Sequence, residues 1–155
     1  MLKAIPIGWC SWSFWIEDKA GRFAHIDMSW VLESAELDID GERYRVRKPS
    51  AFGGSFELIR DGHVVATAGK RMMVRTFDVQ AGDRPFELSA LSVFGRAFRL
   101  SENGLQIGTM SPVSMWGRTA EVDFPDDFPR DVQVFLIWLV LILWRRAASS
   151  SAAAG

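Results

Sequence analysis

The chain has 155 residues, 48% of them hydrophobic and 12% aromatic, which is enough for a single domain with a sizeable core. Its 18 basic and 19 acidic residues give a net charge of −1, so no basic excess exists to bind nucleic acid. The lone Cys10 excludes an internal disulfide and a cysteine-based structural zinc site, and it fits a reducing compartment.

The first 29 residues form a tryptophan-rich segment, which we expect to supply the first strands of the domain. It lacks a small-x-small cleavage site, so we predict no signal peptide. An aromatic cluster at its start consists of Trp9, Trp12, Phe14 and Trp15, with Trp30 further on. Tryptophan fills cores and also favours membrane interfaces. We expect this cluster to belong to the core, with a membrane interface as the alternative.

Alternating apolar residues and tight-turn dipeptides then predict about a dozen short antiparallel strands. The turn signals include Asp40-Gly41, Asp61-Gly62 and Asn103-Gly104, which are strong signals for two-residue hairpins. The predicted strands are Trp12–Ile16, Arg22–Ile26, Met28–Leu32, Ala35–Ile39, Arg43–Arg47, Ser55–Ile59, Val64–Ala68, Met72–Val79, Phe86–Leu91, Arg96–Ser101, Leu105–Met110 and Thr119–Phe124. Their regular spacing indicates an all-β sandwich or barrel.

The middle of the chain repeats itself at an offset of 42 residues. The matched residues are Phe52-Gly53 with Phe94-Gly95, Phe56 and Leu58 with Phe98 and Leu100, Gly62 with Gly104, Thr67 with Thr109 and, after a one-residue slip, Arg75 with Arg118. Two copies are too few for a solenoid. The repeat therefore favours a duplicated half-barrel or sheet layer.

A helix is predicted over residues 129–146, with Pro129 at its first position. The run Val134–Trp144 is apolar on every face, yet eleven residues make only about 16 Å of helix, half of what a bilayer requires. A barrel of about 12 strands can enclose such a helix. The expected core residues of this helix are Phe135, Leu136, Trp138, Leu139, Leu141, Ile142 and Trp144. We expect the low-complexity tail, residues 147–155, to be disordered.

This combination resembles the tubby C-terminal-like superfamily, which includes phospholipid scramblases and LURP-one-related proteins. The resemblance lies in the Phe-x-Leu hairpins, the Phe-Pro-Asp-Asp-Phe-Pro segment at 124–129 and the apolar helix ending in Arg145-Arg146, and it covers residues 30–146. It implies a closed antiparallel barrel of about 12 strands around a C-terminal hydrophobic helix. It also implies phospholipid binding, although neither a tubby-type basic pocket nor a scramblase-type cysteine cluster can be matched onto this chain.

Few residues indicate chemistry. His25 and His63 have no partners at metal-ligand spacing, and no nucleophile elbow or phosphate-binding loop is present, so we predict no enzyme, metal or cofactor. The best candidates for anionic-lipid contacts are Lys70, Arg71 and Arg75. The alternative for these three residues is a solvated hairpin end.

The sequence thus predicts a non-enzymatic, tubby-like domain that binds a phospholipid membrane or a protein partner, not nucleic acid. We expect it to be cytoplasmic, at most peripheral to a membrane. The alternative is a tail-anchored membrane protein with a cytoplasmic β domain, in which helix 132–144 is the anchor.

Overall fold

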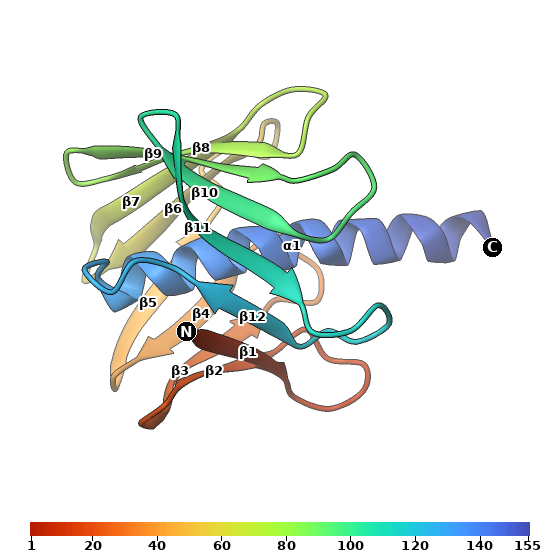
Figure 1. The fold of residues 1–155 in the computed structure, drawn as a ribbon, viewed down its shortest axis with the longest axis horizontal. Helices are drawn as coiled ribbons and strands as arrows, with labels where there is room; N and C mark the ends of the chain where they lie inside the picture. Colours follow the sequence, from red (N-terminus) through yellow and green to blue (C-terminus); the bar gives the residue numbers. More distant parts are fainter.

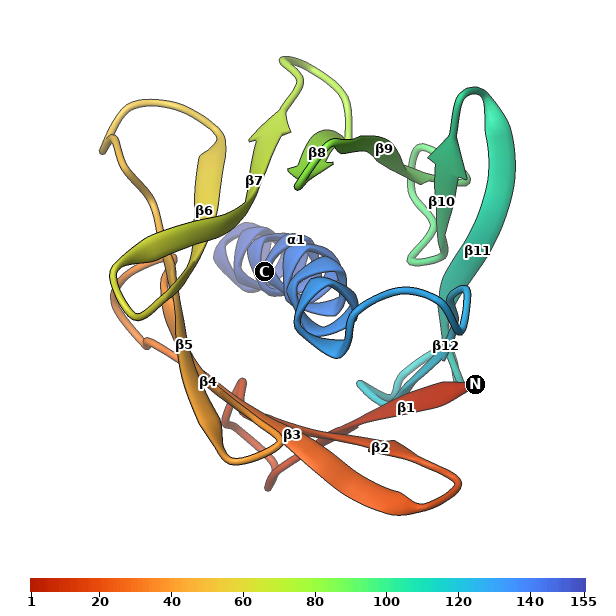
Figure 2. The ribbon, with the colours of Figure 1, turned by 90° about the vertical axis from the view of Figure 1, so that its left-hand side faces the viewer.

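Twelve antiparallel strands close into a barrel around one helix in the computed structural model, which describes all 155 residues (Figures 1 and 2). The strands are β1 (Leu2–Pro6), β2 (Phe14–Asp18), β3 (Gly21–Met28), β4 (Ala35–Ile39), β5 (Glu42–Arg47), β6 (Ser55–Arg60), β7 (His63–Lys70), β8 (Thr76–Ala81), β9 (Arg84–Ala90), β10 (Phe98–Glu102), β11 (Leu105–Pro112) and β12 (Ala120–Asp123). Each strand pairs with its neighbours in the chain, and β1 closes the barrel on β12 through Leu2–Val122 and Ala4–Ala120. The predicted fold class is confirmed.

Local sequence explains the hairpins. In β4, Ala35, Leu37 and Ile39 face the interior while the residues between them face solvent, as the period-2 pattern predicts. Both residues of the Asp40-Gly41, Asp61-Gly62 and Asn103-Gly104 turns have positive φ. Such turns match the right-handed twist of the flanking strands, which is why these dipeptides join them so tightly.

Helix α1 (Arg130–Ala154) runs along the barrel axis. The helix begins one residue later than predicted, so Pro129, with ψ 139°, is the N-cap residue and not the first residue of the helix. Every residue from Val132 to Trp144 is buried, including all of the expected core residues. Because strands surround the helix on all sides, its faces are apolar at this level of the barrel. The one polar residue of the stretch, Gln133, lies near the start of the helix and donates to the Phe128 carbonyl at 2.8 Å.

The predicted elements differ from the structure in two places near the N-terminus. Strand β1 was not predicted, whereas the predicted strand Met28–Leu32 does not exist: Met28 ends β3 and residues 29–32 form a loop. The two errors cancel in the strand count. Trp30, Val31 and Leu32 look like a strand in sequence, but their side chains are exposed and do not contribute to the core. Similarly, β8 begins at Thr76, so Met72 lies in a loop and not in the predicted strand.

The prediction of a disordered tail is wrong. Helix α1 continues to Ala154 and leaves the barrel as an exposed rod (Figure 1). Alanine is the strongest helix former. The Ser150 and Ser151 hydroxyls donate to the main-chain carbonyls of Arg146 and Ala147, so they bind to the helix itself.

The structure extends the two-copy repeat to three. The register of strand pairing shifts at three positions, after Ile16, after Leu58 and after Leu100, which are spaced by 42 residues. Two residues before each of these sites lies a fully buried phenylalanine: Phe14, Phe56 and Phe98. The barrel therefore consists of three four-stranded units, β1–β4, β5–β8 and β9–β12. The first unit escaped sequence comparison because it retains little beyond its inward-facing residues.

Candidate functional site

The two ends of the barrel differ in the composition of their loops. Five two-residue turns and the start of α1 lie at one end, where Arg130 pairs with Asp18 and Asp40. The six longer loops lie at the end from which α1 emerges, as Figure 1 shows on its right-hand side. We call these six loops the crown; they comprise residues 7–13, 29–34, 48–54, 71–75, 91–97 and 113–119.

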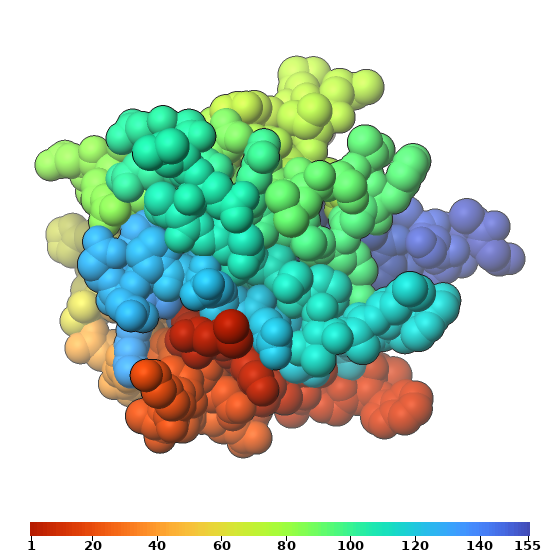
Figure 3. Space-filling view, in the orientation of Figure 1, coloured from red at the N-terminus to blue at the C-terminus, as the bar shows by residue number.

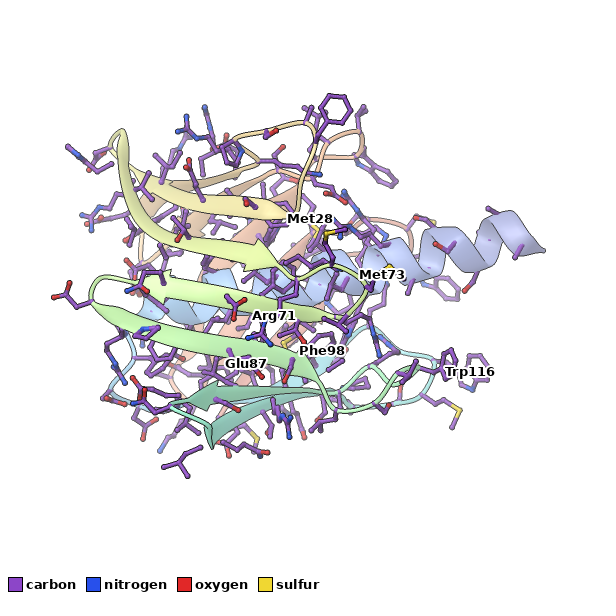
Figure 4. The ribbon with its side chains drawn as sticks, turned by 90° about the horizontal axis from the view of Figure 1, so that it is seen from above. Met28, Arg71, Met73, Glu87, Phe98 and Trp116 are labelled. Atoms are coloured by element: carbon purple, nitrogen blue, oxygen red, sulfur yellow. The ribbon has the colours of Figure 1, made fainter.

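Large apolar side chains are exposed in every crown loop. The exposed residues, in chain order, are Trp9, Trp30, Val31, Leu32, Phe52, Met72, Met73, Val74, Leu91, Val93, Phe94, Val113, Met115 and Trp116. Only Met1, Val64 and Leu105 among the exposed large apolar residues lie elsewhere. Trp9 and Trp116 are 97% and 92% exposed. Figure 4 places Met73 and Trp116 at this end, and Figure 3 shows the crown loops projecting beside the end of α1. Apolar exposure concentrated at one end of a folded protein marks an interaction surface.

The crown is also the basic end of the molecule. The crown loops and the exposed part of α1 together hold one acidic residue, Glu33, and seven basic ones: Lys48, Arg71, Arg75, Arg96, Arg118, Arg145 and Arg146. At the opposite end, six acidic residues face two basic ones: Asp40, Asp61, Asp83, Asp126, Asp127 and Asp131 against Lys19 and Arg130. The near-zero net charge therefore hides a strong separation of charge along the α1 axis.

Arginine side chains hold the crown loops by donating to their main-chain carbonyls. Arg118 donates to the carbonyls of Gly8 and Trp9 at 2.7 and 2.8 Å, and Arg75 donates to that of Val93 at 2.8 Å. Arg75 of the second unit holds the β9–β10 loop of the third unit. Arg118 of the third unit holds the β1–β2 loop of the first unit in the same way. This common role explains why the repeat matches Arg75 with Arg118. Because a carbonyl is neutral, the contact orders the loop without cancelling the arginine's charge.

The end of α1 is attached to the crown in the same way. Arg145 donates to the carbonyls of Ser29 and Leu32 at 2.6 and 3.2 Å. The Trp144 indole donates to the Arg96 carbonyl at 3.0 Å, and the Arg96 guanidinium lies 4.2 Å from the centre of its ring. Core and crown are therefore held in one rigid arrangement.

The three predicted lipid contacts lie together at the crown but differ in charge balance. Arg71 pairs with both Asp78 and Glu87, at 2.6 and 2.9 Å, so its charge is compensated. Figure 4 shows Arg71 and Glu87 close together on the barrel wall. Arg75 bonds to carbonyls, and Lys70 donates to the Arg71 carbonyl at 3.2 Å. Burial lowers the pKa of Lys70, and the nearby Arg146 lowers it further. Arg75 and Lys70 therefore keep positive charges with no carboxylate partner.

The tryptophan-rich cluster divides between core and surface, so the expectation that it forms core is wrong for part of it. Phe14 is fully buried and Trp12 packs against the core. Trp15 lies against His25 with ring centres 4.7 Å apart. Trp9 and Trp30 are exposed at the crown. No cluster of three or more His, Cys, Asp or Glu side chains is arranged to hold a metal ion.

Sequence reasoning missed most of the crown, including its aromatic tips and the arginines that hold its loops. A signal was present: the connections alternate along the chain between short Asp-Gly-type turns and longer loops with apolar tips. Since alternate connections of an up-and-down barrel lie at the same end, this alternation predicts one apolar end. Comparisons with protein families, with curated proteins and with solved structures return no match to this chain.

Proposed function

We propose that this protein is a non-enzymatic, tubby-like barrel that docks on anionic phospholipid membranes through the crown. The observation that carries the proposal is the coincidence, at one end only, of exposed aromatic loop tips and a surplus of basic residues. Aromatic residues favour the headgroup region of a bilayer, and basic residues are attracted to anionic lipids. A closed barrel of twelve strands around one helix is the fold that the resemblance to the tubby-like superfamily implies.

Order-of-magnitude binding energies favour a lipid surface as the partner of the crown. Each basic residue near an anionic leaflet contributes about 1 kcal/mol. Half-burying an indole of roughly 200 Å² adds about 2.5 kcal/mol at about 25 cal/mol per Å². Docking in this orientation directs the exposed end of α1 towards the bilayer and turns the acidic end towards solution. An anchor role for α1 would instead require its core residues to leave the barrel, since 72% of its most apolar stretch is buried there.

Vesicle sedimentation of the full chain tests the proposal. We expect binding to vesicles that contain phosphatidylserine, weaker binding to pure phosphatidylcholine, and loss of the difference in high salt because ions screen the basic residues. Trp116→Ser should weaken binding about 30-fold, the equivalent of about 2 kcal/mol. Leu105→Ser is the matched control: this residue is also exposed, but it lies at the start of β11, next to the Asn103-Gly104 turn at the opposite end.

Absence of binding to either vesicle would refute the proposal. A soluble dimer that dissociates when Trp116 is replaced, without any vesicle binding, would assign the crown to a second copy of the chain. Equal effects of the Trp116 and Leu105 substitutions would show that the crown has no special role.

A further inference from the structure

A hollow of about 620 Å³ opens in the crown between the β3–β4 loop and the exposed end of α1. Trp12 and Trp30 contribute indole rings to its lining. Its polar lining includes the carboxylate of Glu33 as well as Arg145, Arg146 and Ser149. In the docked orientation proposed above, on which this inference rests, the hollow faces the headgroups of the membrane.

The Arg145 guanidinium has no carboxylate partner. It donates to the neutral carbonyls of Ser29 and Leu32, which uses two of the five N–H groups of an arginine. Burial lowers the pKa of Arg145, which means that its positive charge is poorly solvated where it lies. An arginine nevertheless stays charged. An anion that entered the hollow would supply the missing counter-charge.

The only nearby carboxylate is already occupied. Glu33 accepts hydrogen bonds from Arg146 and from Lys48, the former including one of 2.6 Å and the latter one of 3.1 Å. The hydrogen bond from Arg146 is the main reason that the pKa of Glu33 falls to about 2. Two cations therefore share one anion at this place. Glu33 makes no ion pair with Arg145 and offsets its charge only at longer range, where burial outweighs it.

We propose that this hollow binds the phosphate of a phosphomonoester, with Arg145 as its cation and the Ser149 hydroxyl as a further donor. Arginine pairs with phosphate oxygens through two parallel hydrogen bonds, and a doubly charged phosphomonoester gains more from this pairing than a carboxylate. The Ser149 side chain makes no hydrogen bond within the protein, unlike that of Ser150. The indole rings form an apolar wall suited to the glycerol and acyl part of a lipid such as phosphatidic acid.

The test compares two variants that add the same charge to the same exposed stretch of helix. Ser149→Asp places a carboxylate at the hollow, whereas Ala152→Asp places one on a residue that does not line it. Binding is measured to vesicles that contain phosphatidic acid or phosphatidylserine at equal surface charge. We expect the wild type to prefer phosphatidic acid at least fivefold, Ser149→Asp to abolish that preference, and Ala152→Asp to weaken both bindings equally.

Loss of the phosphate site and loss of membrane docking give different results in these assays. If the wild type binds both vesicles equally, or if the two variants act alike, docking stands but the phosphate site is refuted. If neither vesicle binds, titration of inorganic phosphate separates the remaining cases. A shift of the Arg145 Nε–H resonance that Ser149→Asp abolishes would support the site with a free phosphate as its ligand, and no shift would overturn it.

Discussion

Trp138 provides a sharp test of the packing between helix and barrel. Its side chain is fully buried, and its ring lies 5.0 Å from that of Phe56 in an edge-to-face arrangement. Its Nε1–H has no hydrogen-bond partner. A buried donor without a partner costs about 1–3 kcal/mol, so the indole stabilises the core by its size and destabilises it by its N–H group.

Replacement by phenylalanine separates these two effects. Trp138→Phe removes the donor but leaves roughly 40 Å³ of space, which costs about 1 kcal/mol at about 24 cal/mol per Å³, with a similar loss of transfer energy. Gain and loss nearly cancel, so we expect the free energy of unfolding to change by no more than about 1 kcal/mol. Trp138→Ala removes the ring altogether and should cost about 3–5 kcal/mol.

Urea titration followed by circular dichroism measures both changes. The slope of the transition should be the same in both variants, so that the midpoints report stability directly. If Trp138→Phe is as damaging as Trp138→Ala, the reasoning is refuted, because the indole N–H would then have a partner such as a buried water.

Two further predictions concern the ends of α1 and its attachment to the barrel. Truncation after Arg146 should leave the unfolding midpoint unchanged because the removed residues are exposed. Removal of all residues from Asp131 onward should unfold the barrel, and a folded product of this longer deletion would contradict the core role of α1. Glu33 has a lowered pKa, so its stabilisation is complete above about pH 4.5 and is lost as the pH falls towards about 2. Glu33→Gln should therefore lower the free energy of unfolding at pH 7 by about 1–2 kcal/mol and weaken its dependence on pH in the acid range. The control Glu36→Gln breaks only an exposed pair with Arg45 and should do neither. If the free energy of unfolding varies with pH in the same way in the Glu33 variant and the wild type, this prediction is refuted.

Much of the barrel could be predicted because its determinants are local. Asp61-Gly62 specifies a tight turn by its backbone preferences alone, and Phe98 and Leu100 show their common face by spacing alone. The interior position of α1 was predictable for a different reason: a helix that is apolar on all faces has to be surrounded.

The failures have two causes, the first of which is that an apolar residue looks the same in sequence whether it serves the core or a surface. Trp30 and its neighbours have strand-like composition, yet they form an exposed loop. Ala147 to Ala154 look like a disordered tail, yet they continue a helix that the barrel has already nucleated, so that only elongation remains.

The sequence by itself determined the class of fold, the hairpin turns and the burial of Val134–Trp144, because each follows from spacing or from local backbone preference. Only the tertiary structure decided that six loops meet at one end, that their apolar tips point outwards, and that Arg145 lies beside a hollow without a carboxylate partner. These features depend on barrel closure, which brings together residues such as Gly8 and Arg118 from opposite ends of the chain. No local pattern records such proximity.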